Sequence, residues 1–150
     1  MEWKFVGESD FDWIMDTARE MHAESNWSKK VKFREDKVKK YFHTVLTNPD
    51  MFGIIAHKDD KNIGFMTGTV MEYSFGTEKF AREIDLYVKK EHRGKMEAIM
   101  MMKMFKAWAK TKGAKEIIFE PGGVDNTDRF DAMAKRLDMK EVGKIYRGDL

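Results

Sequence analysis

The chain has 150 residues, a formal net charge of +2 and no cysteine. A chain of this length can bury a sizeable core as one domain, and the near balance of 28 basic and 26 acidic side chains requires neither a nucleic acid nor a membrane surface as a partner. The absence of cysteine excludes disulfides, thiolate nucleophiles and cysteine-based zinc sites. The N-terminus lacks a signal-peptide pattern and no apolar run reaches membrane-spanning length, so we expect a single soluble, cytoplasmic domain over residues 1–150.

The first third of the chain predicts a strand followed by two helices. Residues 2–6 are typical of a short strand. Apolar residues then recur at helical spacing from 11 to 21 and from 33 to 46, which predicts two helices joined by a polar connection at 23–30. Pro49 ends the second helix.

From residue 51 onward the pattern predicts strands first and then alternating helices and strands. The strands 81–88 and 114–120 are joined by a helix, so they must run parallel. We therefore predict an α/β fold with a mixed, mostly antiparallel central sheet, one parallel strand pair and helices on both faces. The expected strands are 51–57, 63–75, 81–88, 114–120 and 140–150, and the expected helices are 94–112 and 127–137.

A basic turn, KKEHRGKMEA at residues 89–98, connects the strand 81–88 to the helix that follows. The first N–H groups of a helix lack partners and the helix dipole adds partial positive charge, so such a turn is suited to bind an anion. Basic side chains at this end of a helix oppose the dipole, and a bound polyphosphate would reverse that effect. The alternative is a solvated loop without a ligand.

This strand, turn and helix resemble the pyrophosphate-binding segment of the GNAT superfamily of N-acetyltransferases. The family motif is Gln or Arg, two residues, Gly, one residue, and then Gly or Ala. Arg93 matches the first place and Ala98 the last, while Met96 stands at the central glycine. The order of elements along nearly the whole chain is also similar to the family, and Asn126 fits the asparagine that precedes the family's late helix.

The resemblance implies acetyl-CoA as the cosubstrate. Its pyrophosphate is expected on the backbone N–H groups of residues 93–98, with the side chains of Met96 and Glu97 turned away toward solvent. Its pantetheine arm is expected to pair with the backbone of strand 81–88 as an added strand. The residues that the resemblance assigns to acetyl-CoA binding are Leu86, Tyr87, Val88, Arg93, Gly94, Lys95, Met96, Glu97, Ala98 and Asn126.

The reaction implied is direct attack of a primary amine on the thioester, which needs a base for the ammonium proton and an acid, or solvent, for the leaving thiolate. Glu83, Asp85 and Glu120 are the candidate bases, and each of them has the alternative of a salt bridge or a solvated position. Tyr146 is the candidate acid, because the family's tyrosine is absent from the late helix. In a regular strand Glu83, Asp85 and Tyr87 share one face, an expectation that a β-bulge would remove.

The acetyl acceptor, a small-molecule or protein amine, is expected between residues 25–30, which contain Trp27, and the aromatic loop 72–80. The four histidines have no ligand spacing, so no metal site is expected. The alternative function is a GNAT-like module that has lost catalysis and serves to bind an acyl-CoA or a protein. The sequence leaves open whether the protein forms a homodimer.

Overall fold

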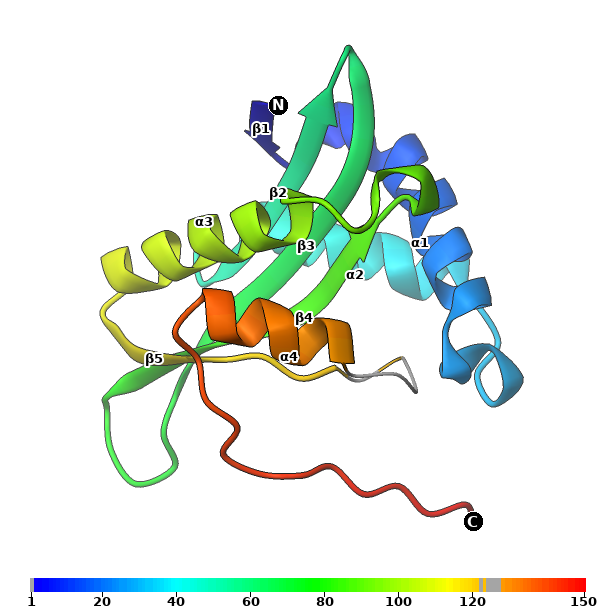
Figure 1. Ribbon diagram of the computed structural model, residues 1–150. Helices are drawn as coiled ribbons and strands as arrows, with labels where there is room; N and C mark the ends of the chain where they lie inside the picture. Colours follow the sequence, from blue (N-terminus) through cyan, green and yellow to red (C-terminus); the bar gives the residue numbers. More distant parts are fainter. Residues whose placement is uncertain (1, 122, 124–127) are drawn as a thin grey trace.

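The computed structural model describes residues 2–121, 123 and 128–150, and a five-stranded sheet runs through its centre (Figure 1). The strand order follows the chain, and every neighbouring pair is antiparallel except the last, β4 and β5, which is parallel. This arrangement confirms the predicted mixed sheet. The strands are β1 (Glu2–Phe5), β2 (Met51–Lys58), β3 (Lys61–Glu72), β4 (Lys79–Val88) and β5 (Ala114–Ile118).

Two helices pack on each face of the sheet, with α3 and α4 in front of the strands in Figure 1. Among the described residues, no helix has both the length and the apolar composition that a membrane span needs. The helices are α1 (Phe11–Glu24), α2 (Glu35–Thr47), α3 (Glu97–Thr111) and α4 (Asp128–Arg136), and the short 3-10 turns are η1 (Glu8–Asp10), η2 (Asn26–Lys29) and η3 (Lys90–His92).

The face covered by α1 and α2 has an aromatic core. Phe65 of β3 lies at its centre, with the ring of Phe42 at 5.7 Å and that of Trp13 at 6.5 Å, both edge to face. Such pairs add to the stabilisation that comes from burying the rings. The buried apolar residues of this face are Val6, Ile14, Ala18, Phe42, Val45, Ile55, Phe65 and Tyr87.

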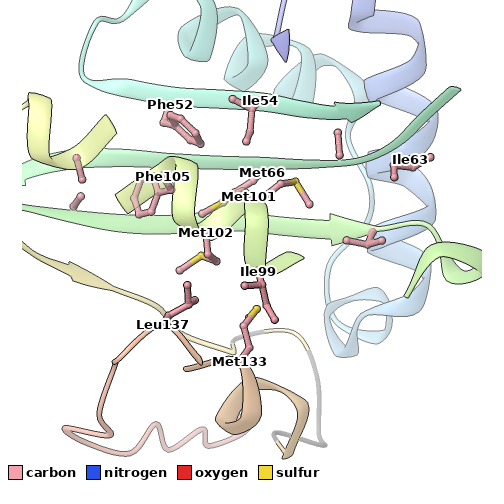
Figure 2. Close-up of a cluster of buried hydrophobic side chains, with 14 of the residues drawn as sticks. Phe52, Ile54, Ile63, Met66, Ile99, Met101, Met102, Phe105, Met133 and Leu137 are labelled. Atoms are coloured by element: carbon pink, nitrogen blue, oxygen red, sulfur yellow. The ribbon is translucent and has the colours of Figure 1, made fainter. Parts of the chain in front are cut away.

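The face covered by α3 and α4 has a core rich in methionine (Figure 2). Met101 and Met102 of α3 are fully buried, and Figure 2 shows Leu137 beside Met102 and Met133 below Ile99. The flexible thioether side chains of methionine fill irregular gaps between helix and sheet. The run of methionines in α3 therefore serves mainly for packing.

Strand β4 carries a β-bulge that reverses its alternation. Thr67 pairs with Asp85 and the next residue of β3 pairs with Glu83, so Ile84 is the extra residue. As a result Ala81 packs in the α3–α4 core while Tyr87, six residues later, packs in the α1–α2 core. The expectation that Glu83, Asp85 and Tyr87 share one face of a regular strand is therefore wrong.

Residues 140–150 do not form the predicted final strand. They lie outside any helix or strand, are exposed, and extend from α4 past the lower side of the molecule in Figure 1. The segment contains two glycines and few apolar side chains, so it cannot bury enough surface to offset the cost of ordering it in a sheet. Its contacts are the Arg147 guanidinium 4.3 Å above the Trp27 ring and an ion pair between Lys30 and Asp149.

Gly68 is required where β3 passes beneath α3. A methyl group at this position would lie 2.5 Å from Cε2 of Phe105 and 3.0 Å from the carbonyl oxygen of Arg82. We expect Gly68→Ala to lower the free energy of unfolding by about 1–3 kcal/mol through overpacking, as measured by denaturant unfolding. Gly143→Ala is the control, because no atom lies within 4 Å of its added methyl; equal stability of the two variants would contradict this account.

Candidate active site

The parallel strands β4 and β5 separate halfway along β4. Their pairing ends at Arg82 opposite Ile118, and β5 stops at that residue. Within the described part of the chain, the edge of β4 from Glu83 to Val88 therefore has no strand neighbour on the β5 side. An unpaired strand edge offers N–H and C=O groups to an extended ligand.

Glu83 is a buried carboxyl group at the point where the two strands separate. It accepts a hydrogen bond from the backbone N–H of Glu120, just after β5. Burial, followed by the proximity of Asp85, raises the pKa of Glu83 to about 8. A carboxyl group with such a pKa exchanges its proton near neutral pH, which is what a general base must do.

Asp85 belongs to a partly buried polar network with two hydroxyl groups. The Thr67 hydroxyl donates to Oδ2 of Asp85 at 3.1 Å, and the Tyr41 hydroxyl lies 2.7 Å from Oγ1 of Thr67. Burial raises the pKa of Asp85, although the bonds from Thr67 and Tyr41 oppose that shift. Burial and the charge of Asp85 also raise the pKa of Tyr41, so its phenol stays protonated as a donor.

The other two predicted catalytic residues lie in different surroundings. Glu120 is half-exposed and forms an ion pair with Arg82 at 2.6 Å, while its backbone N–H binds Glu83. Tyr146 is 86% exposed in the irregular C-terminal segment. The structure therefore brings Glu83, Asp85 and Glu120 together but leaves Tyr146 apart from them.

The turn before α3 presents unpaired backbone N–H groups. Gly94 has a φ of +80°, a conformation that glycine adopts without strain, and α3 begins three residues later. No described residue accepts a hydrogen bond from the N–H groups of Gly94, Lys95 or Met96. Together with the first N–H groups of α3, including that of Ala98, they form a cradle suited to an anion. We call residues 94–98 the amide cradle.

Arg93, the first residue of the motif, is bound within the protein. Its Nε–H donates to the Val88 carbonyl oxygen at 2.7 Å, its Nη2 donates to Oε2 of Glu24 at 2.7 Å, and its guanidinium lies over the Tyr87 ring. Burial raises the pKa of Glu24, but hydrogen bonds from Tyr87 and Arg93 outweigh it and bring the pKa below its usual range. Arg93 therefore anchors the turn to α1 and β4.

Glu97 and Met96 differ in where their side chains lie. Met96 is 44% exposed, but Glu97 is only 4% exposed and its Oε2 has no hydrogen-bond partner among the described residues. The expectation that Glu97 faces solvent is therefore wrong. The cause is its helical position, because Glu97, Met101 and Phe105 lie four residues apart on the buried side of α3.

The remaining predicted binding residues lie at the end of β4, except for one. Leu86 and Val88 pack against the α3–α4 core, whereas Tyr87 points to the opposite face and donates its hydroxyl to Glu24 at 2.7 Å. Tyr87 can therefore offer a ligand only its backbone N–H and C=O groups, at the edge of β4 that faces β5. Asn126 lies outside the described residues.

Several residues of this site were missed by the sequence reasoning. Tyr41 falls within the predicted helix 33–46, Thr67 within the predicted strand 63–75 and Glu24 within the polar connection 23–30. Their roles depend on contacts between residues 18 to 69 positions apart, such as Thr67 with Asp85 and Arg93 with Glu24. A hydroxyl residue at an inward position of a strand is the one signal that could have indicated Thr67.

A cavity lies elsewhere, between the end of α2 and the start of β2. Its volume is about 340 Å³, and it is lined mainly by apolar side chains such as Phe5, Val45 and Met51, with no ionisable group. It therefore offers binding volume without groups for acid–base chemistry. The candidate site is defined by the strand separation and the amide cradle instead.

Comparison with known proteins shows the family of the chain. Residues 13–135 match the model of the acetyltransferase (GNAT) family, and the chain belongs to that family. No curated protein matches the sequence. The fold is thus that of a GNAT acetyltransferase, as the resemblance implied.

Solved structures share the fold over nearly their whole length at low sequence identity. An aminoglycoside antibiotic 6′-N-acetyltransferase from Acinetobacter haemolyticus is 21% identical, with a TM-score of 0.76, 100% of this chain covered and 98% of the other. A probable acetyltransferase is 16% identical, with a TM-score of 0.78 and coverage of 100% and 97%. An aminoglycoside acetyltransferase from an uncultured soil metagenomic sample is 16% identical, with a TM-score of 0.71 and coverage of 99% and 95%.

The raised pKa of Glu83 makes stability depend on pH. Its folded-state pKa of about 8 exceeds the ordinary value of 4.5, so the folded protein binds more protons between these values and its stability falls as the pH rises through that range. We expect Glu83→Gln to flatten this decline, which one carboxyl group limits to about 1.4 kcal/mol per pH unit. Denaturant unfolding from pH 5 to 9 measures it. Glu116→Gln, at an exposed carboxylate bound by Tyr73, is the control, and an unchanged slope in Glu83→Gln would refute the assignment.

The buried carboxylate of Glu97 is expected to cost stability. Replacing it with methionine removes an unpartnered buried oxygen and keeps a similar volume, while the favourable interaction with the dipole of α3 is lost. We expect Glu97→Met to raise the free energy of unfolding by about 1–2 kcal/mol. Glu91→Gln, at an exposed position in η3, should leave stability unchanged; a lower unfolding midpoint for Glu97→Met would contradict the prediction.

Proposed function

We propose that this protein is an N-acetyltransferase that transfers an acetyl group from acetyl-CoA to a primary amine by direct attack. The observation that carries the proposal is the position of Glu83. Its carboxyl group, with a pKa of about 8, lies where β4 and β5 separate, on the strand whose end leads into the amide cradle. A titrating base and an anion site on one strand fit acyl transfer from a phosphate-bearing thioester.

The residues present fit acetyl-CoA at two places. The amide cradle has donors without protein acceptors among the described residues, as a pyrophosphate needs. The unpaired edge of β4 from Glu83 to Val88 has backbone groups available for the amides of the pantetheine arm. The Val88 carbonyl already accepts from Arg93, so its second lone pair is the one that remains.

When bound, acetyl-CoA supplies the activated acetyl thioester that the amine attacks. Glu83, ionised, takes the proton from the ammonium form of the acceptor and so generates the nucleophile. Asp85 keeps the environment of Glu83 negative and raises its basicity, and the hydroxyls of Thr67 and Tyr41 hold Asp85 in place. Solvent rather than Tyr146 protonates the leaving thiolate in this proposal, because Tyr146 is exposed in the C-terminal segment.

The acceptor is proposed to be a cationic amine, because it must approach two neighbouring carboxyl groups, one buried and one half-buried. Two of the similar solved structures are aminoglycoside acetyltransferases, so aminoglycosides stand first in a panel with polyamines, amino acids and N-terminal peptides. Each candidate is assayed with acetyl-CoA for release of CoA. Glu83→Gln should lower kcat/KM by about 10²–10⁴-fold for the best acceptor, the usual contribution of a general base.

The second candidate function is a binding module that has lost catalysis. It is favoured by Met96 at the place of a motif glycine and by the buried carboxylate of Glu97 beside the amide cradle. The two functions differ in whether any amine of the panel accelerates release of CoA. Binding of acetyl-CoA without turnover of any acceptor would favour the module.

Binding of acetyl-CoA is tested by thermal unfolding. A ligand at one hundred times its dissociation constant stabilises the folded state by about 2.7 kcal/mol, so millimolar acetyl-CoA should raise the unfolding midpoint clearly. Arg93→Glu should abolish this shift, because it places a carboxylate beside Glu24 and releases the turn. Lys37→Glu, at an exposed position on α2, is the matched charge reversal and should keep the shift; no shift in the unmodified protein would end the enzyme proposal.

A further inference from the structure

The basic residues of the turn before α3 are partly neutralised by acids of α1. Lys89 pairs with Glu20 at 2.6 Å, and Lys90 and Arg93 both approach Glu24, at 3.7 Å and 2.7 Å. Three of the four Lys and Arg residues of this turn therefore share two carboxylates, and among the described residues Lys95 has no ion pair. Because two carboxylates offset much of the charge of the turn, a cation from another element would add to what the turn offers an anionic ligand.

Arg136, in the last turn of α4, lies at the amide cradle although it is forty residues away in sequence. Its Nη1 is 3.8 Å from Sδ of Met96, the residue that caps the N-terminus of α3. The side chain is exposed, and within residues 2–121, 123 and 128–150 the thioether is its one recorded partner. A thioether sulfur is a weak acceptor, whereas a guanidinium has five N–H donors. Arg136 is thus a cation with its hydrogen-bonding capacity almost unused.

We propose that Arg136 binds a phosphate group of the cosubstrate and supplies the charge that Arg93 cannot. This inference rests on the proposed function, because it assumes that a CoA thioester occupies the amide cradle. The planar fork of a guanidinium matches two oxygens of a phosphate, and such charge-assisted bonds are the stronger kind. The exposed side chain of Met96 would be the surface along which the guanidinium moves to the ligand.

The packing of α4 on α3 explains why the guanidinium is held there. Met133 and Leu137 are buried against Ile99 and Met102, as Figure 2 shows, so the last turn of α4 is fixed relative to α3. A side chain on a helix points back toward its N-terminus, which directs Arg136 to the beginning of α3. Lys135, the preceding residue, has the same charge and helical turn but no recorded contact with the amide cradle.

Calorimetric titration with CoA tests the proposal. We expect Arg136→Gln to weaken CoA binding about tenfold, the usual effect of losing a hydrogen bond to a charged group, and Arg136→Lys to weaken it less, since the charge remains without the fork. Lys135→Gln removes the same charge from the same helix end and should bind as the unmodified protein does. The unfolding midpoints of the free variants should be equal, because both side chains are exposed.

The same titrations with 3′-dephospho-CoA identify which phosphate is bound. A tenfold loss with both ligands assigns Arg136 to the pyrophosphate, and a loss with CoA alone assigns it to the 3′-phosphate; both results support the proposal. Equal affinity of Arg136→Gln and the unmodified protein for CoA would overturn it, as would an equal loss in Lys135→Gln. If the unmodified protein binds no CoA, the proposed function itself fails, a result distinct from these.

Discussion

Strand β4 is paired with β3 along its whole length but with β5 only up to Arg82. The bulge at Ile84 follows immediately, and it turns the second half of the strand so that Asp85 lies against Thr67 while Ala81 remains in the opposite core. The unpaired edge of β4 and the carboxyl groups of Glu83 and Asp85 therefore lie together at the bulge. Bulges often occur next to active sites for this reason, because they redirect a side chain and end a ladder at once.

The first helix contributes to the candidate site from the other side of the sheet. Glu24 accepts hydrogen bonds from both Tyr87 and Arg93, so its carboxylate joins α1, β4 and the turn before α3. The turn is held at its base while the N–H groups of residues 94–98 stay open to a ligand. An anion site is preorganised when its backbone is held in place and its N–H donors are free to bind the ligand.

The order of elements and the parallel β4–β5 pair could be predicted because periodicity and connection rules depend on local sequence. The motif likewise located the turn at the N-terminus of α3. The face of each carboxyl group on β4 could not be predicted, since a bulge leaves no pattern in the residues around Ile84. The ion pairs of Lys89 and Arg93 depend on α1, more than sixty residues earlier. The strand predicted at 140–150 does not form, because its apolar and polar residues alternate only weakly and the segment pairs with no strand of the sheet.

The methionines differ in their accessibility to oxidants. Met66, Met101 and Met102 are fully buried, whereas Met96 is 44% exposed at the lip of the amide cradle. Peroxide converts accessible thioethers to sulfoxides, so it reaches Met96 well before the methionines of the core. The sulfoxide oxygen is a far better acceptor than sulfur, and it would form beside the guanidinium of Arg136. Met71, at 46% exposed, is as accessible as Met96, so oxidation would reach the candidate site among the first positions and the buried methionines last.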